Sequence, residues 1–256
     1  MKGNCKIHKF DNGVCVYDAH LLQSQRERYS KKNVHEEDEE EIFLSIIGNL
    51  SPRDVFVNVG TAIGYYPILS KMIRNDIDVH CFEPLIRHIK YLNENIELNH
   101  LSTEEFCIHQ LAVSNETGEV LFNDNSYGSS IMPSRKAVSV ANWLRAVRDS
   151  VILKKNKQSP LRVKAIRLAE VFHLIDKHRI HFLQMDIQGF ELPVLEKYFE
   201  DVQCCSNVIE SFLVGTHSAE IHKACLDLFQ RNSYHILKDI QESLNQPDGI
   251  IYCRFK

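Results

Sequence analysis

The sequence predicts an α/β protein with a Rossmann-like, mostly parallel, seven-stranded sheet that is covered by helices on both faces. From residue 51 onward, short apolar segments rich in β-branched residues alternate with longer segments of helical periodicity. The first of these strands runs directly into a glycine-rich turn that opens a helix. Alternating strands and helices form parallel sheets with crossover helices on both faces. A chain of 256 residues, 44% of them hydrophobic, can form one such domain with a full core.

The expected elements follow one another in a regular order. Strands are predicted at 14–17, 54–59, 78–82, 106–113, 119–122, 181–186, 207–212, 234–237 and 249–254. Helices are predicted at 63–73, 86–98, 138–147, 171–178, 192–199 and 220–230. Residues 1–50 lack the Rossmann pattern, so we expect an N-terminal extension that packs on a core domain at 51–256. Residues 124–160 interrupt the alternation and are predicted to form an insertion or lid.

The acidic run from Glu36 to Glu41 precedes an apolar segment and is predicted to begin a helix. Acidic side chains suit the first turn of a helix because they face the positive end of its dipole. We expect this turn to be solvated, and a metal site built from the run is the alternative.

Composition excludes several classes of protein. The chain has 30 Lys and Arg against 34 Asp and Glu, a net charge of −4, whereas a dedicated nucleic-acid binder carries a basic surplus. The first residues lack the apolar stretch of a secretory signal, and no apolar run is long enough to span a bilayer. Eight cysteines stand at irregular positions without a CxxC pair. We therefore expect reduced, mostly buried thiols and a cytoplasmic location.

Two features predict a nucleoside site at the carboxyl edge of the sheet. Gly60 and Gly64 bound a turn between a buried strand and a helix, where glycine allows a tight bend and a close ligand approach. Glu83 ends the next strand, where a carboxylate can accept hydrogen bonds from both ribose hydroxyls. Either feature alone occurs in many folds, but their order and spacing together favour an adenosine-type ligand.

Two further segments carry candidate catalytic groups. Asp186 ends a central strand and Glu191 begins the following helix, although either can serve as a helix cap. Glu210 is placed late in the next strand, and His217 lies in the loop that follows it. A histidine there can take a proton from a hydroxyl near neutral pH, although most histidines have no such role.

These motifs together resemble those of FkbM-type methyltransferases over residues 50 to 256. The matching segments are Val57-Asn58-Val59-Gly60, Phe82-Glu83-Pro84, the 89–99 helix with Asn95 and Asn99, Leu111-Ala112-Val113-Ser114, Asp186-Ile187-Gln188-Gly189-Phe190-Glu191 and Gly215-Thr216-His217-Ser218. The resemblance implies S-adenosylmethionine as cofactor, S-adenosylhomocysteine as product, and O-methylation of a hydroxyl, often on a sugar or natural product.

The resemblance also implies roles for individual residues. Gly60 and Gly64 would line the methionine end of the cofactor, Glu83 would hold its ribose, and Ala112 and Val113 would lie near the adenine. Asp186, Glu210 and His217 would border the methyl-transfer site, with Asp186 also at the cofactor. The chain departs from the family at Asn58, a cofactor-binding position where Asp is usual, and at Gln188, where Glu is usual.

We therefore predict an S-adenosylmethionine-dependent O-methyltransferase in which His217 or Asp186 removes the acceptor proton. The basic side chains of the insertion suit a sugar- or phosphate-containing small-molecule acceptor, although a solvated insertion explains them equally well: Arg135, Lys136, Arg145, Arg148, Lys154, Lys155 and Lys157. We expect no metal, no nucleic-acid partner and no membrane span; a homodimer is compatible with the sequence.

Three alternatives stay open. A nucleotide-sugar or NAD-dependent oxidoreductase would use a similar sheet, but the turn lacks the G-x-G-x-x-G pattern. A methyltransferase can act on a macromolecule. A cofactor-binding module with little or no activity is suggested by Asn58 and Gln188, although the retained Glu83, Asp186 and His217 argue against it. An ion held by Asp186, Glu210 and His217 is the alternative to a metal-free site.

Overall fold

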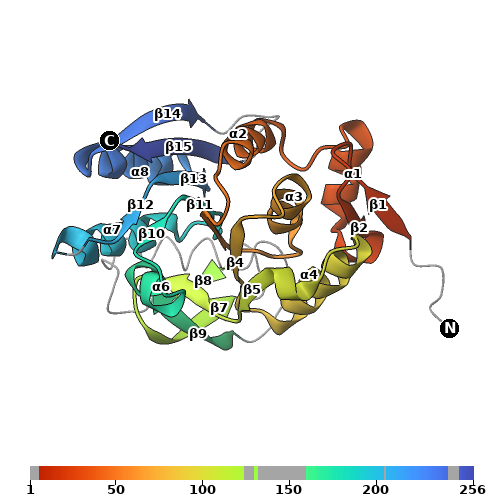
Figure 1. Cartoon of the computed structure of the whole chain (residues 1–256), viewed down its shortest axis with the longest axis horizontal. Helices are drawn as coiled ribbons and strands as arrows, with labels where there is room; N and C mark the ends of the chain where they lie inside the picture. The colour runs from red at the N-terminus through yellow and green to blue at the C-terminus, as the bar shows by residue number, and fades with distance from the viewer. Residues whose placement is uncertain (1–5, 124–129, 132–159, 205, 242–247) are drawn as a thin grey trace.

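The computed structural model describes residues 6–123, 130–131, 160–204, 206–241 and 248–256 (Figure 1). Its centre is a seven-stranded sheet in the order β14-β15-β13-β11-β3-β4-β5. The strands are β3 (Val55–Val59), β4 (Asp78–Phe82), β5 (Phe106–His109), β11 (Phe182–Met185), β13 (Ser211–Thr216), β14 (Tyr234–Ile240) and β15 (Gly249–Phe255). Strand β15 runs opposite to the other six strands of this sheet. The predicted mostly parallel seven-stranded sheet is confirmed.

Helices cover both faces of this sheet, and its central strands are therefore buried on both sides. On one face, β3 and β11 place Val57 and Leu183 in a core shared with α6 (Leu168–Leu174), α7 (Glu191–Asp201) and α8 (Ala219–Arg231). On the other face, Phe56 and Phe182 stack at 5.0 Å in a core shared with α2 (Glu37–Gly48), α3 (Tyr65–Ile73) and α4 (Ile86–Leu98). The near-continuous apolar runs seen in the sequence reflect this two-sided burial.

Residues 6–50 pack on the second of these cores (Figure 1). They form β1 (Ile7–Lys9), β2 (Cys15–Tyr17), the short 3₁₀ helix η1 (Asp18–His20), α1 (Gln23–Lys31) and α2. Strand β2 lies against α4, where Asn95 and Asn99 accept hydrogen bonds from the amides of Tyr17 (3.1 Å) and Cys15 (2.8 Å). The N-terminal segment is thereby fixed to the helix that follows β4. The pattern of the sequence did not predict β1 or α1.

A second sheet, in the order β6-β9-β7-β8, stands beside the main one. Its strands are β6 (Ala112–Ser114), β7 (Gly118–Asn123), β8 (Ser130–Ile131) and β9 (Leu161–Arg167). The single strand predicted at 106–113 is therefore wrong. The Leu111 amide donates to the His109 carbonyl at 2.9 Å, and this three-residue turn sends the chain out of the main sheet.

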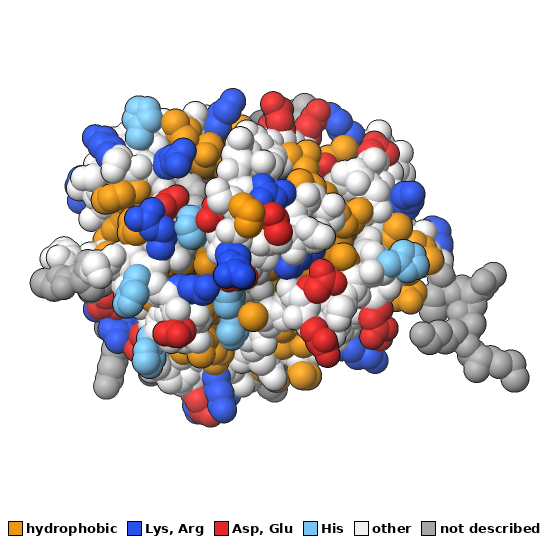
Figure 2. All heavy atoms as spheres, in the orientation of Figure 1, with side chains coloured by type: hydrophobic (Ala, Val, Ile, Leu, Met, Phe, Trp, Pro, Cys, Tyr) orange, Lys and Arg blue, Asp and Glu red, His pale blue; other side chains and the backbone are white. Residues whose placement is uncertain are grey.

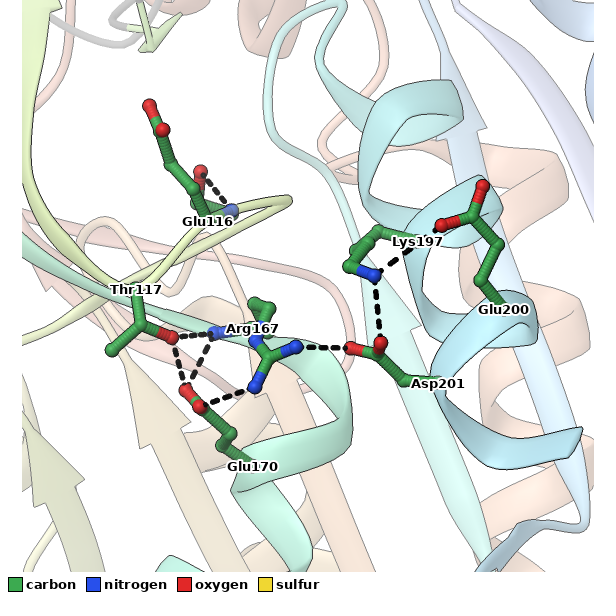
Figure 3. Close-up of polar contacts among 8 residues, drawn as sticks. Glu116, Thr117, Arg167, Glu170, Lys197, Glu200 and Asp201 are labelled. Atoms are coloured by element: carbon green, nitrogen blue, oxygen red, sulfur yellow. Dashed lines mark hydrogen bonds and ion pairs between the residues drawn. The ribbon is translucent and has the colours of Figure 1, made fainter. Parts of the chain in front are cut away.

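An ion-pair network links the second sheet to α7 (Figure 3). Arg167, at the end of β9, contacts Glu170 at 2.8 Å and Asp201 at 3.0 Å, and Lys197 reaches Asp201 at 2.8 Å. Glu170 also accepts from the Arg167 amide and so caps α6 at its first turn. This cap starts α6 at Leu168, three residues before the predicted start, and Asp176 with φ 53° ends it before the predicted 178.

The predicted lid at 124–160 lies almost wholly outside the described residues, together with the expected helix at 138–147. Its flanks are described: β7 ends just before it and β9 begins just after it, both in the second sheet, and β8 lies within it. Two minor strands, β10 (Arg179–Ile180) and β12 (Val208–Ile209), form a parallel pair, and η2 (Thr103–Glu105) and η4 (Val202–Cys204) are short 3₁₀ helices. Among the described residues, no helix is long and apolar enough to cross a membrane.

Candidate functional site

A cavity of about 310 Å³ opens at the carboxyl ends of β3, β4 and β11. Val59 pairs with Met185 on one side and with Phe82 on the other, so the residues that follow these three strands meet at one edge. Those residues are Gly60, Asp186 and Glu83. Strand β3 is also where the order of the sheet reverses, which is where open α/β sheets bind ligands.

The turn after β3 brings the backbone close to the neighbouring strand end. Gly60 has φ 87°, and a Cβ atom there would lie 2.0 Å from the carbonyl oxygen of Asp186. Glycine is therefore required for both conformation and space. Gly64 has φ 86° and begins α3, where a Cβ atom would lie 2.1 Å from Leu92 Cδ1. Gly64 does not line the cavity, so its place in the structure is that of a helix start packed on α4.

Glu83 lines the cavity with a carboxylate that is fixed from three directions. Its Oε2 accepts from the Ala62 amide at 2.9 Å, and its Oε1 accepts from the Leu85 amide at 2.9 Å and lies 3.2 Å from His88 Nδ1. A carboxylate has about four lone-pair positions, so one position is left to accept from a ligand's hydroxyl. The wall beyond Glu83 is apolar and is formed by the turn before β6 and by the second sheet: Leu111, Ala112, Val113, Phe122 and Ile131.

Asp186 faces the cavity with about a third of its side chain exposed, and His217 stands behind it. His217 Nε2 lies 3.2 Å from Asp186 Oδ1 and 3.5 Å from Asp248 Oδ1, and Nδ1 lies 3.0 Å from Glu191 Oε1. Glu191 is fully buried and also accepts from the amides of Ile187 and Gly189, both at 3.1 Å. The ring of His217 is thus enclosed by three carboxylates and does not itself line the cavity.

This environment sets the protonation states of His217 and Asp186. Burial favours a neutral imidazole, but the carboxylates of Asp186 and Glu191 outweigh burial and raise the pKa of His217 to about 11. Burial opposes the ionised form of Asp186, yet His217 and the Gln188 amide, 2.9 Å away, hold the pKa of Asp186 below its usual value. At neutral pH, His217 is an imidazolium and Asp186 a carboxylate.

Asp186, Glu191 and His217 also form a group that an ion could bridge, since one atom from each lies within 4.8 Å of the others. Glu210, which the sequence placed with them, lies elsewhere. It precedes β13, at the opposite edge of the sheet from Asp186, and pairs with Arg179. The sequence predicted a strand at 207–212 with Glu210 late in it, whereas β13 begins at Ser211, directly after Glu210.

The N-terminal segment supplies a further wall of the cavity, which the sequence did not predict. Arg28, His35 and Glu36 line it, and Glu39 lies directly behind. The acidic run is therefore not a fully solvated helix start: Glu39 and Glu40 are buried in α2. Glu40 accepts from the Tyr65 hydroxyl of α3, and Glu39 accepts from Gln184 Nε2 of β11 at 2.6 Å, so both face the core.

Asn58 completes the floor of the cavity next to this wall. The side chain is buried, and its Nδ2 donates to Gln184 Oε1 at 2.8 Å. Its Oδ1 is buried without a hydrogen-bond partner among the described residues. The residues implied at the cofactor thus come together around one cavity, except for Gly64: Asn58, Gly60, Glu83, Ala112, Val113 and Asp186.

The chain matches a known protein family. Residues 54–236 match the family described as the methyltransferase FkbM domain. No curated protein sequence matches the chain.

Among solved structures, three similar ones are methyltransferases by name. An rRNA methylase from Streptococcus thermophilus has 5% identity and a TM-score of 0.48, over 85% of this chain and 97% of that one. A precorrin-6y C5,15-methyltransferase from Geobacter metallireducens has 8% identity and a TM-score of 0.45, over 88% and 91%. A putative tRNA (m1A22) methyltransferase from Streptococcus pneumoniae, in complex with S-adenosyl-L-methionine, has 12% identity and a TM-score of 0.44, over 84% and 72%. At such values, the substrates of these proteins do not carry over to this chain.

Proposed function

The chain belongs to the FkbM methyltransferase family, whose cofactor is S-adenosylmethionine, and we propose that it methylates a hydroxyl group of a small molecule. The observation that carries this proposal is the meeting of Glu83 and Asp186 at one cavity. Glu83 is placed to bind a ribose, and Asp186 is an ionised carboxylate at the other side, where an acceptor hydroxyl can lose its proton.

The choice between His217 and Asp186 as proton acceptor follows from their charges. An imidazolium has no free lone pair and cannot accept a proton, and the pKa of His217, raised to about 11 by its carboxylate neighbours, keeps the ring in this form. We therefore assign proton removal to Asp186 and a positioning role to His217, which holds Asp186 ionised and oriented. A low pKa makes Asp186 a weak base, so alignment of the acceptor oxygen with the methyl group provides most of the acceleration.

The charge distribution of the chain favours a small acceptor over a nucleic acid. On the face shown in Figure 2, basic and acidic side chains are interspersed over the described residues, whereas proteins that hold nucleic acids concentrate basic side chains. Sugars and phosphorylated sugars carry suitable hydroxyls, and the basic residues of 124–160 suit a phosphate.

The test measures which products receive the tritiated methyl group of S-[methyl-³H]adenosylmethionine. The protein is incubated with the labelled cofactor and an extract containing both metabolites and macromolecules, and the products are separated by size. We expect label in small molecules as an ether that withstands mild base, and less than 1% of this transfer with Asp186→Asn, as befits loss of a general base. The variant should still bind S-adenosylhomocysteine. Label recovered mainly on RNA or protein would refute the small-molecule acceptor, and unchanged turnover of the variant would refute the role of Asp186.

A further inference from the structure

Three charged side chains of the N-terminal segment stand at or directly behind the cavity wall without a role in the proposed reaction. Arg28 comes from α1, Glu36 precedes α2, and Glu39 lies in its first turn. They adjoin Asn58 at the end of β3 rather than the ribose side of the cavity at Glu83. This corner of the cavity, next to Asn58, would therefore hold a part of a ligand other than the ribose.

A chain of hydrogen bonds fixes the direction of the Asn58 amide. The Glu39 carboxylate accepts from Gln184 Nε2, which leaves Gln184 Oε1 to accept from Asn58 Nδ2. Asn58 Oδ1 is then left as a free acceptor, and it is buried without a hydrogen-bond partner among the described residues. Buried polar atoms are normally satisfied, so this oxygen is an acceptor open to a donor from a ligand in the cavity.

The neighbouring carboxylates favour a cationic donor. Burial and the closeness of Glu39 raise the pKa of Glu36 well above its usual value, and burial also raises the pKa of Glu39. The cation beside them is Arg28, whose Nη1 is 3.6 Å from Glu36 Oε1. A single guanidinium next to two crowded carboxyl groups leaves room for a second positive charge.

Arg28 supplies the opposite half of the charge pattern. Its guanidinium lies at the cavity wall, and its Nε is buried without a hydrogen-bond partner among the described residues. A guanidinium with a free N–H suits a carboxylate. One corner of the cavity therefore offers an acceptor and carboxylates for a cation, and a guanidinium for an anion.

We propose that Arg28, Glu36, Glu39 and Asn58 form a subsite for the zwitterion of an α-amino acid, the methionine end of the cofactor. Asn58 Oδ1 and the Glu36 carboxylate hold the ammonium group, Glu39 adds negative charge from directly behind the wall, and Arg28 holds the carboxylate. The negative charge that position 58 does not supply comes instead from the N-terminal segment. This inference rests on S-adenosylmethionine as the cofactor and gives residues 6–50 a part in binding it.

The test compares two ligands that share a thioether nucleoside and differ in the amino acid. S-adenosylhomocysteine has the zwitterion, and 5′-methylthioadenosine lacks it. Their affinities are measured by calorimetry for the full chain and for Glu36→Gln, Glu39→Gln and the control Glu41→Gln, an exposed carboxylate of α2. We expect the first two variants to lose about tenfold or more for S-adenosylhomocysteine and less than twofold for 5′-methylthioadenosine. Glu41→Gln should match the unmodified protein.

Three outcomes would overturn the subsite. Unchanged affinity of both Glu36→Gln and Glu39→Gln for S-adenosylhomocysteine would show that the carboxylates do not meet the cofactor. An equal loss for both ligands would show general damage to the cavity, and thermal unfolding of the variants would reveal it. Failure of the unmodified protein to bind S-adenosylhomocysteine would refute the cofactor assignment itself, a result distinct from the first two.

Discussion

Replacement of Gly60 by alanine tests how the site is built, because this glycine, in the turn after β3, packs directly against the backbone at the end of β11. Gly60 has φ 87°, a conformation that costs an L-residue about 1–2 kcal/mol. The new Cβ would also lie 2.0 Å from the Asp186 carbonyl oxygen and 3.0 Å from its carbonyl carbon. These are backbone atoms held in place by the sheet, since the Asp186 amide donates to the Val59 carbonyl at 3.1 Å.

The magnitude follows from adding the two effects. Overpacking a rigid site costs typically about 1–3 kcal/mol. Together with the backbone term, Gly60→Ala should lower the free energy of unfolding by roughly 2–5 kcal/mol. Relief of the clash must separate β3 from β11 at their carboxyl ends, which moves Asp186. The variant that folds should therefore also bind S-adenosylhomocysteine at least tenfold more weakly.

The backbone strain and the steric clash are separated by replacing two other glycines with alanine. The stability of each variant is measured by urea unfolding, followed by far-ultraviolet circular dichroism. Gly118 has φ 133° with no atom within 4 Å of a built Cβ, so Gly118→Ala carries only the backbone strain, about 1–3 kcal/mol. Gly48, at the end of α2, has neither strain nor contact, and Gly48→Ala should stabilise by about 0.4–1 kcal/mol. If Gly60→Ala were no less stable than Gly118→Ala and bound S-adenosylhomocysteine normally, the close packing of Gly60 against Asp186 would be refuted.

Two further predictions concern charges at the site. His217 has a pKa raised from 6.5 to about 11 on folding, so the folded state holds an extra proton between these values. Its stabilisation is complete below pH 6.5 and is lost as pH rises towards 11, at up to about 1.4 kcal/mol per pH unit. The stability difference between the unmodified protein and His217→Gln, measured by urea unfolding, should therefore shrink from pH 7 to pH 9; parallel curves would contradict the imidazolium. Glu83→Gln should weaken S-adenosylhomocysteine and 5′-methylthioadenosine alike, by about 10- to 100-fold in calorimetry, because both contain the ribose. A loss confined to S-adenosylhomocysteine would place Glu83 at the amino acid instead.

The sheet and the ribose side of the site were predictable because their signals are local. An apolar β-branched segment predicts a strand, and the residue after it lies at the carboxyl edge whatever the rest of the chain does. Gly60, Glu83 and Asp186 each follow such a segment directly. Parallel pairing then brings them together, since all parallel strands end at the same edge.

The turn out of the main sheet at Leu111 had only a weak signal. Residues 106–113 are apolar except for His109 and Gln110, and the break depends on a single short-range hydrogen bond and on pairing of β6 with β9, some fifty residues later. The environment of His217 was equally hidden. Its carboxylate neighbours come from positions 186, 191 and 248, and only the folded chain shows that they take away its capacity to act as a base.

The carboxylates of α2 and of the residue just before it did leave a signal in the sequence. Glu40, Glu39 and Glu36 stand three, four and seven residues before Phe43, which is fully buried. That spacing puts them on the same helix face as the core, whereas a solvated first turn would put its acids on the other face. The dipole argument explained why acids occur in the first turn and took no account of which face they occupy.

The position of these carboxylates also bears on how the cofactor would be held. The sheet supplies groups for the nucleoside, from residues whose backbone is fixed by strand pairing on both sides. The amino-acid end would meet side chains of α1, of α2 and of the residue between them. Helix α2 is joined to β11 by the hydrogen bond from Gln184 to Glu39 and to α3 by the hydrogen bond from Tyr65 to Glu40. A ligand that spans both parts connects residues 6–50 to the sheet in addition to the existing core contacts. A neutral Asn58 fits this arrangement, because a third carboxylate beside Glu36 and Glu39 would raise the cost of burying charge at that corner before any cation arrived.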